Sequence, residues 1–275
     1  MTSIPTRVAI LSRTPGSAQV ARLAQAVSAQ GGTPLPMLSG AARRGAADVW
    51  LSRLGSGTPP AEVDLLETRG LRPMLNGPRS LHLTHDKPLA LARLSAAGLP
   101  VPPTLLVLRD VPPERDALPG ERLVVKPPTG QSGRGVMVGL PRDEAFARAQ
   151  AYAELCGRAL VQPWLGQGLD RRVLQVGSRA VAAMQRRPGP DGRGNVAQGG
   201  EATAWQPDAS QLSLARRAQQ TLGLDVAGVD LLVHAGRTLI LEVNACPGFT
   251  AIEAVCGEDV AGAVARLALQ RAGEV

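Results

Sequence analysis

Two acidic residues near the end of the chain lie in neighbouring apolar runs that read as the strands of one hairpin. The runs 227–234 (AGVDLLVH) and 238–245 (TLILEVNA) are separated by the short glycine-containing turn 235–237. This pattern predicts two antiparallel strands. Residue 236 is the midpoint between Asp230 and Glu242. The two carboxylates should therefore face each other across the hairpin.

A divalent metal ion is the partner that such a pair of carboxylates predicts. Two opposed acids in apolar strands repel each other and are costly to bury, and a cation between them removes both costs. Asn244, two residues after Glu242, should lie on the same face of its strand. An oxygen-only set of two carboxylates and one amide suits Mg²⁺ or Mn²⁺. Asp230, Glu242 and Asn244 are the predicted metal ligands; the alternative is an acid that points to solvent or pairs with an arginine.

A glycine-rich loop between two apolar runs provides a candidate phosphate site. In the segment 123–138 (LVVKPPTGQSGRGVMV) one strand-like run ends at a lysine, and a second follows the loop. Glycine lets backbone N–H groups approach phosphate oxygens without a side chain in the way. Since a strand and not a helix follows, a hairpin flap over phosphates is predicted in place of a P-loop. The predicted phosphate-binding residues are Lys126, Gly130, Ser132, Gly133 and Gly135.

The choice between lysine and arginine singles out further positions. Lysine occurs only at Lys87 and Lys126 among 30 basic residues, so these two positions are expected to need a compact ammonium charge. The arginine pairs 171–172 and 186–187 alternate faces in two strand-like runs. One arginine of each pair can face a cleft and stabilise phosphoryl or acyl-phosphate oxygens. A solvated basic edge strand is the competing explanation.

Composition excludes several classes of protein. With 275 residues, 44% of them hydrophobic, the chain can bury a core in two or three domains. Aromatic residues make up 2%, which argues against stacking platforms for single-stranded nucleic acid, although the net charge of +7 suits an anionic partner. No apolar run approaches the roughly 20 residues that span a bilayer. Three cysteines without a CxxC pair and a start without a signal-peptide pattern predict a cytoplasmic protein.

The histidines and cysteines give no further motif. His82 and His85 stand three residues apart without cysteines at matching spacing, and a surface or structural role is predicted for both. Cys246 has no histidine and aspartate placed to activate it, so a packing role is predicted.

The elements that position these residues form three consecutive units of an α/β (α+β) protein. Residues 1–80 begin with a strand at 7–12 and a helix at 18–30, typical of an open α/β domain, but lack the G-x-G-x-x-G motif of a dinucleotide fold. Residues 81–159 combine helices and strands around the glycine-rich loop. Residues 160–275 contain the arginine pairs and the predicted metal hairpin.

Taken in order, these segments resemble the ATP-grasp ligases, and among them the RimK-type α-L-glutamate ligases. The resemblance extends over nearly the whole chain, with its most specific blocks LDVAGVDLL at 224–232 and EVNACPGFTAIE at 242–253. Further blocks are DVWLSRLG at 48–55, LVQPWL at 160–165 and GRGN at 192–195. The resemblance implies an ATP-grasp fold, in which an N-terminal α/β domain and two α+β subdomains enclose a nucleotide cleft. It also implies ATP and Mg²⁺ or Mn²⁺, with two metal ions, as cofactors.

The resemblance implies roles for individual nucleotide-binding residues. Asp170 would bind ribose, and Arg193 and Asn195 would lie near the triphosphate. The segment 162–165 would be the adenine hinge, and proline at 163 is tolerable there because the hinge uses its carbonyl. The nucleotide-binding set implied in this way is Lys87, Lys126, Gln162, Pro163, Trp164, Leu165, Asp170, Arg193 and Asn195.

The resemblance also covers the metal and substrate residues. Asp230, Glu242 and Asn244 match the family's metal ligands. Arg172 and Arg187 would stabilise an acyl phosphate as catalytic residues. Arg53, Arg172 and Arg187 would thus be the arginines nearest the chemistry, with Arg53 against the amino-acid substrate.

The function that the resemblance implies is Mg²⁺- and ATP-dependent formation of an amide bond. A carboxylate would take the γ-phosphoryl group of ATP, and an amine, expected to be the α-amino group of glutamate, would then displace phosphate. The expected partners are glutamate and a carboxylate acceptor such as a protein C-terminus, a peptide or a small molecule. No membrane and no stable nucleic-acid partner is expected, and a homo-oligomer stays open.

Three alternatives also stay open. The chain could be a LysX-type ligase acting on a carrier protein, an ATP-grasp kinase, or a ribosome- or RNA-associated protein that binds ATP without turnover. Residues 197–200 read AQGG where RimK-type ligases often carry His-Arg-Gly-Gly. This departure removes a charge near the acceptor site and so concerns the identity of the acceptor.

Overall fold

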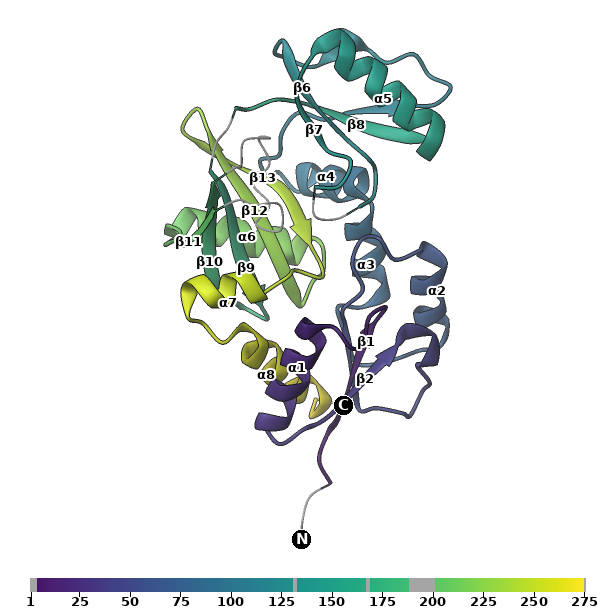
Figure 1. The fold of residues 1–275 in the computed structure, drawn as a ribbon, viewed down its shortest axis with the longest axis vertical. Helices are drawn as coiled ribbons and strands as arrows, with labels where there is room; N and C mark the ends of the chain where they lie inside the picture. Colours follow the sequence, from purple (N-terminus) through teal and green to yellow (C-terminus); the bar gives the residue numbers. More distant parts are fainter. Residues whose placement is uncertain (1–3, 131–132, 167–168, 188–200, 275) are drawn as a thin grey trace.

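Three β-sheets with helices on their faces make up the protein, whose computed structural model describes residues 4–130, 133–166, 169–187 and 201–274. Figure 1 shows the N-terminal sheet at the bottom, the C-terminal sheet in the middle and the central sheet at the top. The predicted mixed α/β class is confirmed. Within the described residues, no helix combines the length and the apolar character that crossing a membrane requires.

The first sheet is parallel and has the strand order β2-β1-β3-β4. Its elements are β1 (Arg7–Ser12), α1 (Ala18–Ala29), β2 (Thr33–Leu38), the short 3₁₀ turn Ser39–Ala41, β3 (Val49–Ser52), α2 (Pro60–Thr68), β4 (Met74–Leu75) and α3 (Pro78–His85). Strand β1 is buried on both faces, as is typical of the centre of a parallel sheet. Strand β2 is not predicted from the sequence because it contains Pro34 and Pro36. It is tolerated because it lies at the edge of the sheet, where a missing N–H costs little.

The second sheet is antiparallel and has the order β5-β8-β6-β7. Its elements are α4 (Lys87–Ala96), β5 (Leu105–Leu108), the 3₁₀ turn Arg115–Ala117, β6 (Arg122–Lys126), β7 (Met137–Pro141), α5 (Arg142–Cys156) and β8 (Arg158–Pro163). Helix α5 packs Phe146 and its small alanines onto one face of this sheet. The predicted boundary at 159/160 falls inside β8, and the boundary at 80/81 falls inside α3, so the sheets divide the chain a few residues away from the predicted limits.

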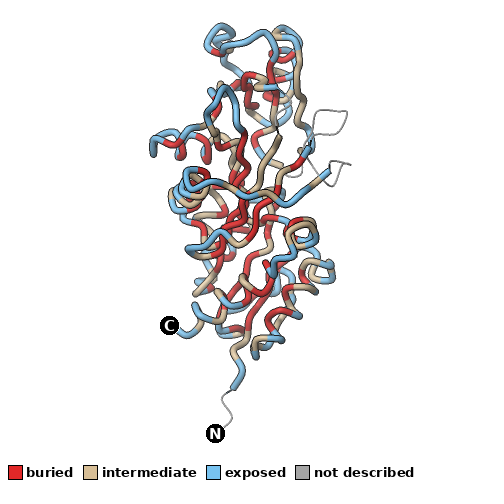
Figure 2. The backbone as a smooth tube through the Cα atoms, turned by 90° about the vertical axis from the view of Figure 1, so that its left-hand side faces the viewer, coloured by how far each residue is buried: buried red, intermediate tan, exposed pale blue. Residues whose placement is uncertain are grey.

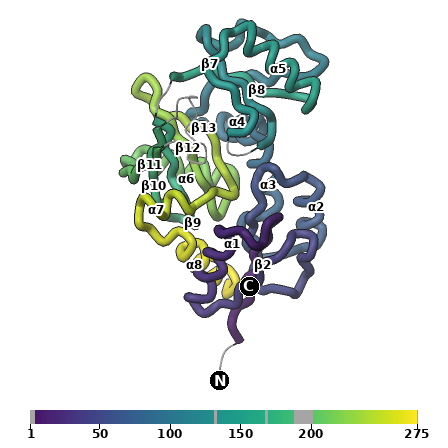
Figure 3. The backbone as a smooth tube through the Cα atoms, viewed as in Figure 1, coloured from purple at the N-terminus to yellow at the C-terminus, as the bar shows by residue number. Residues whose placement is uncertain are grey.

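The third sheet, in the order β11-β10-β9-β12-β13, carries most of the predicted site residues. Its elements are β9 (Asp170–Val176), β10 (Arg179–Arg187), β11 (Glu201–Ala204), α6 (Ala209–Thr221), β12 (Val226–His234), β13 (Arg237–Asn244), α7 (Thr250–Cys256) and α8 (Val260–Ala272). Helix α6 covers one face. The other face shares a core with the N-terminal sheet, and α8 returns to lie beside α1 (Figure 3). The buried residues accordingly run along the strands, with exposed residues on the outer turns (Figure 2).

The hairpin of β12 and β13 confirms the predicted pairing of Asp230 with Glu242, by a different route. The turn contains two residues and not three: Ala235 and Gly236 have φ of 48° and 76°, and the following arginine already pairs in the strand. Positive φ at both central residues is the geometry of a tight hairpin turn. A bulge at Leu241 then shifts the register by one residue and brings the two acids opposite each other.

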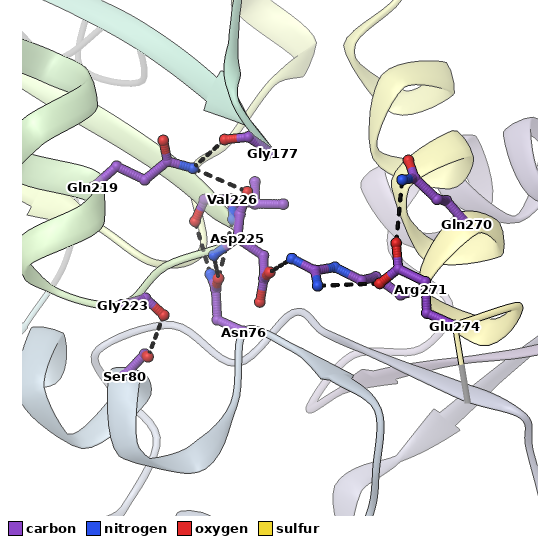
Figure 4. A network of polar contacts seen from close by, with 10 residues as sticks. All are labelled: Asn76, Ser80, Gly177, Gln219, Gly223, Asp225, Val226, Gln270, Arg271 and Glu274. Atoms are coloured by element: carbon purple, nitrogen blue, oxygen red, sulfur yellow. Dashed lines mark hydrogen bonds and ion pairs between the residues drawn. The ribbon is translucent and has the colours of Figure 1, made fainter. Parts of the chain in front are cut away.

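A buried asparagine fastens the N-terminal domain to this hairpin (Figure 4). Asn76 is 1% exposed. Its Nδ2 donates to the carbonyl oxygens of Val226 and Ala245, both at 2.7 Å. Its Oδ1 accepts from the backbone N–H groups of Asp225 (2.6 Å) and Val226 (3.0 Å). Since Val226 begins β12 and Ala245 follows β13, one side chain closes the open end of the hairpin.

We expect Asn76→Ala to lower the free energy of unfolding by about 3 kcal/mol, because four buried backbone groups lose their partner. Ser80→Ala is the matched control at the same interface. It removes one hydrogen bond, from Oγ to the carbonyl oxygen of Gly223 (2.6 Å), and should cost about 1 kcal/mol. Urea unfolding curves measure both losses. Equal losses in the two variants would contradict the role of Asn76.

Candidate active site

A single large cavity lies where the three sheets meet. Its volume is about 1020 Å³, large enough for a nucleotide and a second ligand. Its walls include Ser12 and Arg53 from the N-terminal domain, Lys126 from β6, and Asp230 and Glu242 from the C-terminal hairpin. Residues far apart in the sequence thus line one space.

Asp230 is the most constrained charge in the cavity. It is 6% exposed, and Arg172, directly opposite it on β9, holds both its oxygens, with Nε–Oδ1 and Nη2–Oδ2 distances of 2.6 Å. Nη2 of Arg186 lies 3.1 Å from Oδ1 of Asp230 and 2.5 Å from Oδ2 of Asp170. The two arginines therefore join the two aspartates into one buried charge cluster.

Glu242 faces a different cation. Nζ of Lys87, at the start of α4, lies 2.6 Å from Oε1 of Glu242, and the backbone N–H of Lys87 donates to the carbonyl oxygen of Pro128 in the glycine-rich loop (3.0 Å). Lys126 is the last residue of β6 and lies close enough to Lys87 and Glu242 for their charges to shift its pKa. Both lysines of the chain are thus in the cavity.

Burial shifts the pKa of three of these groups. Burial alone would raise the pKa of Asp230, but the charges of Arg172 and Arg186 outweigh it and hold this pKa below its ordinary value. Burial and the nearby charge of Asp230 raise the pKa of Asp170 to about 6. Burial and the charge of Lys87 lower the pKa of Lys126 to about 8. Asp230 is therefore a carboxylate at neutral pH, and Lys126 is an ammonium that holds its proton weakly.

The cluster contains buried polar atoms that no described residue satisfies. Oδ1 of Asp170 and Nε of Arg186 have no hydrogen-bond partner in the described part of the chain. Buried polar groups are nearly always paired. One acceptor and one donor left open beside the same cavity favour a polar ligand there. Together with Lys87, Lys126 and Glu242, these site residues carry four cationic side chains against three carboxylates, and this excess positive charge suits an anionic ligand.

The donor set on the hairpin fits a hard divalent cation. Asp230 and Glu242 are opposite each other, and Nδ2 of Asn244 lies 3.4 Å from Oδ2 of Asp230. The described residues contain no cluster of three or more histidine, cysteine, aspartate or glutamate side chains that could hold a metal ion, so the third ligand atom would be the amide oxygen of Asn244. Carboxylate and amide oxygens suit Mg²⁺ or Mn²⁺.

The second group of cavity residues comes from the central sheet. Gly130 and Gly133 of the glycine-rich loop line the cavity, as does the segment 162–165 at the end of β8. Gly135 lies outside the lining: its carbonyl accepts a hydrogen bond from the hydroxyl of Tyr152 (2.7 Å), which holds the loop to α5. The loop is thus held to α5 through Gly135 and, on the cavity side, to Ser56, whose hydroxyl donates to the carbonyl oxygen of Gly130 (2.7 Å).

Most predicted site residues are brought together, and some are not. Ser132, Arg193, Asn195 and the segment 197–200 lie outside the described residues. Arg187 is exposed and does not line the cavity, whereas its neighbour Arg186, which the sequence did not distinguish, is 5% exposed and does.

The N-terminal side of the cavity is lined by an arginine held in place by three contacts. Nη2 of Arg53 donates to Oε1 of Gln19 (2.7 Å) and to the carbonyl oxygen of Pro247 (3.0 Å), and the guanidinium lies 5.3 Å from the ring centre of Phe249. His85 lines the same side and is buried. Of the two histidines predicted to have a surface or structural role, His85 is thus buried, whereas His82, one turn earlier on α3, is partly exposed and pairs with Asp64.

A comparison with known families identifies the fold. A family model described as the RimK-like ATP-grasp domain matches residues 84–268. The chain belongs to this family. The ATP-grasp family that the sequence resembles is therefore confirmed.

Relatives within the RimK-like family share about a third of their residues with this chain. Probable alpha-L-glutamate ligase 1 of Shewanella amazonensis is 35% identical over 195 residues, which are 69% of this chain and 65% of that protein. The probable alpha-L-glutamate ligase of Serratia proteamaculans is 35% identical over 232 residues, 82% of this chain and 77% of that protein. The match therefore covers less than two thirds of the first of these relatives.

Solved structures agree on the ATP-grasp fold. A RimK domain ATP-grasp protein from Sphaerobacter thermophilus superposes with a TM-score of 0.72 at 23% identity, covering 96% of this chain and 99% of that one. D-cycloserine synthetase gives 0.78 at 19% identity, covering 97% and 99%. D-alanine–D-alanine ligase from Bacillus anthracis, complexed with ATP, gives 0.76 at 15% identity, covering 99% and 98%.

The two lysines make the pKa of Lys126 directly measurable. With ¹³C-labelled lysine the RimK-like protein should show two Cε signals, and one should titrate with a midpoint near pH 8, below the ordinary value of 10.5. Because the folded state disfavours the ammonium, folding should gain stability as the pH rises from about 8 to 10.5.

Two variants at Lys87 serve as a matched pair for this titration. Lys87→Arg keeps the neighbouring positive charge and should leave the Lys126 midpoint in place. Lys87→Met removes that charge and should raise the midpoint. A midpoint above pH 10 in the protein with lysine at both positions would refute the buried position of Lys126.

Proposed function

We propose that this protein is an ATP- and Mg²⁺-dependent ligase that joins a carboxylate to an amine through an acyl phosphate, with glutamate supplying the amine. The observation that carries the proposal is the opposed pair Asp230–Glu242 in a cavity that also receives Lys87 and Lys126 from the central domain. The names of the relatives, probable α-L-glutamate ligases, support glutamate as the amino acid.

The proposed reaction has two steps. An oxygen of the acceptor carboxylate attacks the γ-phosphorus of ATP, and the bond to ADP breaks. The amine nitrogen then attacks the acyl carbon, and phosphate leaves. Such transfers depend on positioning and on neutralising charge, because the chain itself forms no bond to the phosphoryl group.

The cations of the cavity supply this neutralisation. We assign Lys87 and Lys126 to the phosphate oxygens. We assign stabilisation of the acyl phosphate to Arg172 and Arg186, in preference to Arg187, because they are the arginines that line the cavity. When bound by Asp230, Glu242 and Asn244, Mg²⁺, in one or two ions, supplies further charge neutralisation and orients the phosphates.

The nucleotide occupies the central side of the cavity in this proposal. The segment 162–165 takes the adenine, and Gly130 and Gly133, which line the cavity, contact the phosphates. Ser132, Arg193 and Asn195 stay assigned to the phosphates by the resemblance alone, and Gly135 holds the loop to α5. Asp170 takes the ribose, which is supported by its unpartnered Oδ1, since a ribose hydroxyl would donate to it.

The amino acid and the acceptor occupy the N-terminal side. Arg53 is held with its guanidinium at the cavity wall and would bind a carboxylate of glutamate. The acceptor is a carboxylate of a protein C-terminus, a peptide or a small molecule. The location that we infer for the protein is the cytoplasm, because all three of its cysteines are free thiols and its proposed reaction uses ATP.

Removing one metal ligand should separate activity from folding. Glu242→Gln should lower ATP-dependent glutamate incorporation at least about 100-fold, because one charged ligand is lost. Its melting temperature should change little, because Glu242 is half-buried. Asp230→Asn should lose activity equally but should also lose stability, because Arg172 and Arg186 would keep buried charges without a partner.

In the assay, each variant is incubated with ATP, Mg²⁺, isotopically labelled glutamate and a cell lysate that supplies the acceptor. Mass spectrometry then measures the glutamate added to the acceptor. Glu121→Gln is the control, since Glu121 is exposed and forms no ion pair with described residues. Normal glutamate incorporation by Glu242→Gln would refute the assignment of Glu242 as a metal ligand. Release of ADP that does not need an amine, with no amide product, would favour a kinase.

A further inference from the structure

His85 has an uncommon position for a histidine without an assigned role. It is the last residue of α3, two residues before Lys87, and it is 9% exposed. The surface that it retains is part of the cavity wall. Its neighbours on the wall are Lys87, which reaches the metal hairpin, and the loop from Arg53 to Ser56 of the N-terminal domain. His85 therefore lines the same cavity as Lys87, which is assigned to phosphates, and Arg53, which is assigned to the amino acid.

The backbone fixes which nitrogen of His85 carries hydrogen. Nε2 lies 3.2 Å from the carbonyl oxygen of Leu54. A carbonyl can only accept, so Nε2 must carry the hydrogen and donate it. In the neutral ring, Nδ1 then has a free lone pair. No described residue donates a hydrogen bond to Nδ1, and His85 is not among the residues whose polar atoms are sealed away from solvent without a partner.

The surroundings keep the ring neutral. Burial lowers the pKa of His85, and the charge of His82 on the same helix lowers it further, while the bond to Leu54 opposes this in part. The charged groups next along the chain are Asp86, which pairs with Arg158, and Lys87, which pairs with Glu242. On adjoining elements they are Arg53 beside Leu54 and Asp64 on α2, which pairs with His82. No carboxylate in the described part of the chain forms an ion pair with His85. Nδ1 is thus a neutral acceptor on a residue of the cavity wall, whereas the carboxylates near it are already paired with cations.

We propose that Nδ1 of His85 accepts a hydrogen bond from the amino group of the amino-acid substrate and takes its proton before it attacks. This rests on the proposed ligase function and adds to it the residue that activates the amine. The pairing in the cavity explains the need: its lysines and arginines bind carboxylate and phosphate, its carboxylates are already paired with cations, and an ammonium requires a further acceptor.

The proton balance of the step supports a role for one base. The substrate ammonium gives one proton to Nδ1, and the lone pair of the free amine forms the C–N bond to the acyl carbon. The C–O bond to phosphate breaks, and the departing phosphate takes the second proton from nitrogen. The products are a neutral amide, a phosphate dianion and protonated His85, which passes its proton to solvent.

Two substitutions separate this role from a structural one. Glutamine places its amide near the position of Nε2, so His85→Gln can keep the bond to Leu54 but loses the acceptor at Nδ1. Asparagine places its amide near Nδ1, so His85→Asn keeps an acceptor in the cavity but loses the bond to Leu54. If His85 acts on the amine, His85→Gln should lower glutamate incorporation in the lysate assay about 100-fold, the usual scale for losing a general base. Because an asparagine amide accepts a hydrogen bond but cannot take a proton, His85→Asn should lose about as much activity as His85→Gln, and it should also melt at a lower temperature.

A second readout needs no acceptor. The chain has three histidines, so ¹⁵N-histidine labelling gives three resolvable rings, and His85→Gln assigns one of them. That ring should be in the Nε2–H form, and its Nδ1 signal should move when glutamate is added with a non-hydrolysable ATP analogue. N-acetylglutamate, which has no basic amine, should not move it.

The outcomes distinguish this inference from the proposed function. If the unaltered protein adds glutamate to an acceptor but His85→Gln does so equally well, or if Nδ1 does not respond to glutamate, the role of His85 is overturned and the ligase function stands. If His85→Gln keeps normal activity while His85→Asn loses both activity and stability, His85 only supports Leu54. If the unaltered protein adds no glutamate, both fail together.

Discussion

The buried charge of Asp230 is the constraint on which the site depends. A carboxylate with almost no access to water needs partners of opposite charge, and it obtains them from β9 and β10, through Arg172 and Arg186. Those arginines in turn bring Asp170 into the cluster. Removing any member would leave another charge unbalanced. The cluster is therefore maintained as a unit, and Lys87 and Lys126 beside it give the site the excess positive charge that suits an anion.

This charge problem also links the domains. Glu242 and Asp230 belong to one hairpin, but their cations come from different places: Arg172 from the same sheet, and Lys87 from the start of α4 beside the central sheet. Asn76 fastens the open end of the hairpin to the N-terminal domain. The hairpin is thus held from both sides, and the cavity exists only where these separate contacts converge. The same convergence brings His85 and Arg53 into one cavity with the phosphate-binding groups.

The sequence predicts the elements of this site better than their orientation. Hydrophobic runs, glycine-containing turns and the two isolated lysines were sufficient to find the hairpin, the glycine-rich loop and the cations Lys87 and Lys126. They could not predict β2, because its prolines are tolerated only at an edge, and edge position is a property of the whole sheet. They could not predict the burial of His85 either, since it depends on Leu54, thirty-one residues away in the chain.

Orientation within the sheet depends on two single-residue bulges. In β10 the register against β9 shifts at Val181, so that Arg186 lies opposite Asp170. Without that extra residue, strict alternation would have turned Arg187 toward the cavity, as the sequence suggested. In β13 the bulge at Leu241 compensates for a turn one residue shorter than expected and restores the pairing of Asp230 with Glu242. Alternation predicts which residues share a face only between bulges. In β10 the bulge therefore places Arg186 in the cavity in place of Arg187, whereas in β13 the bulge and the shorter turn offset each other, and Asp230 still pairs with Glu242.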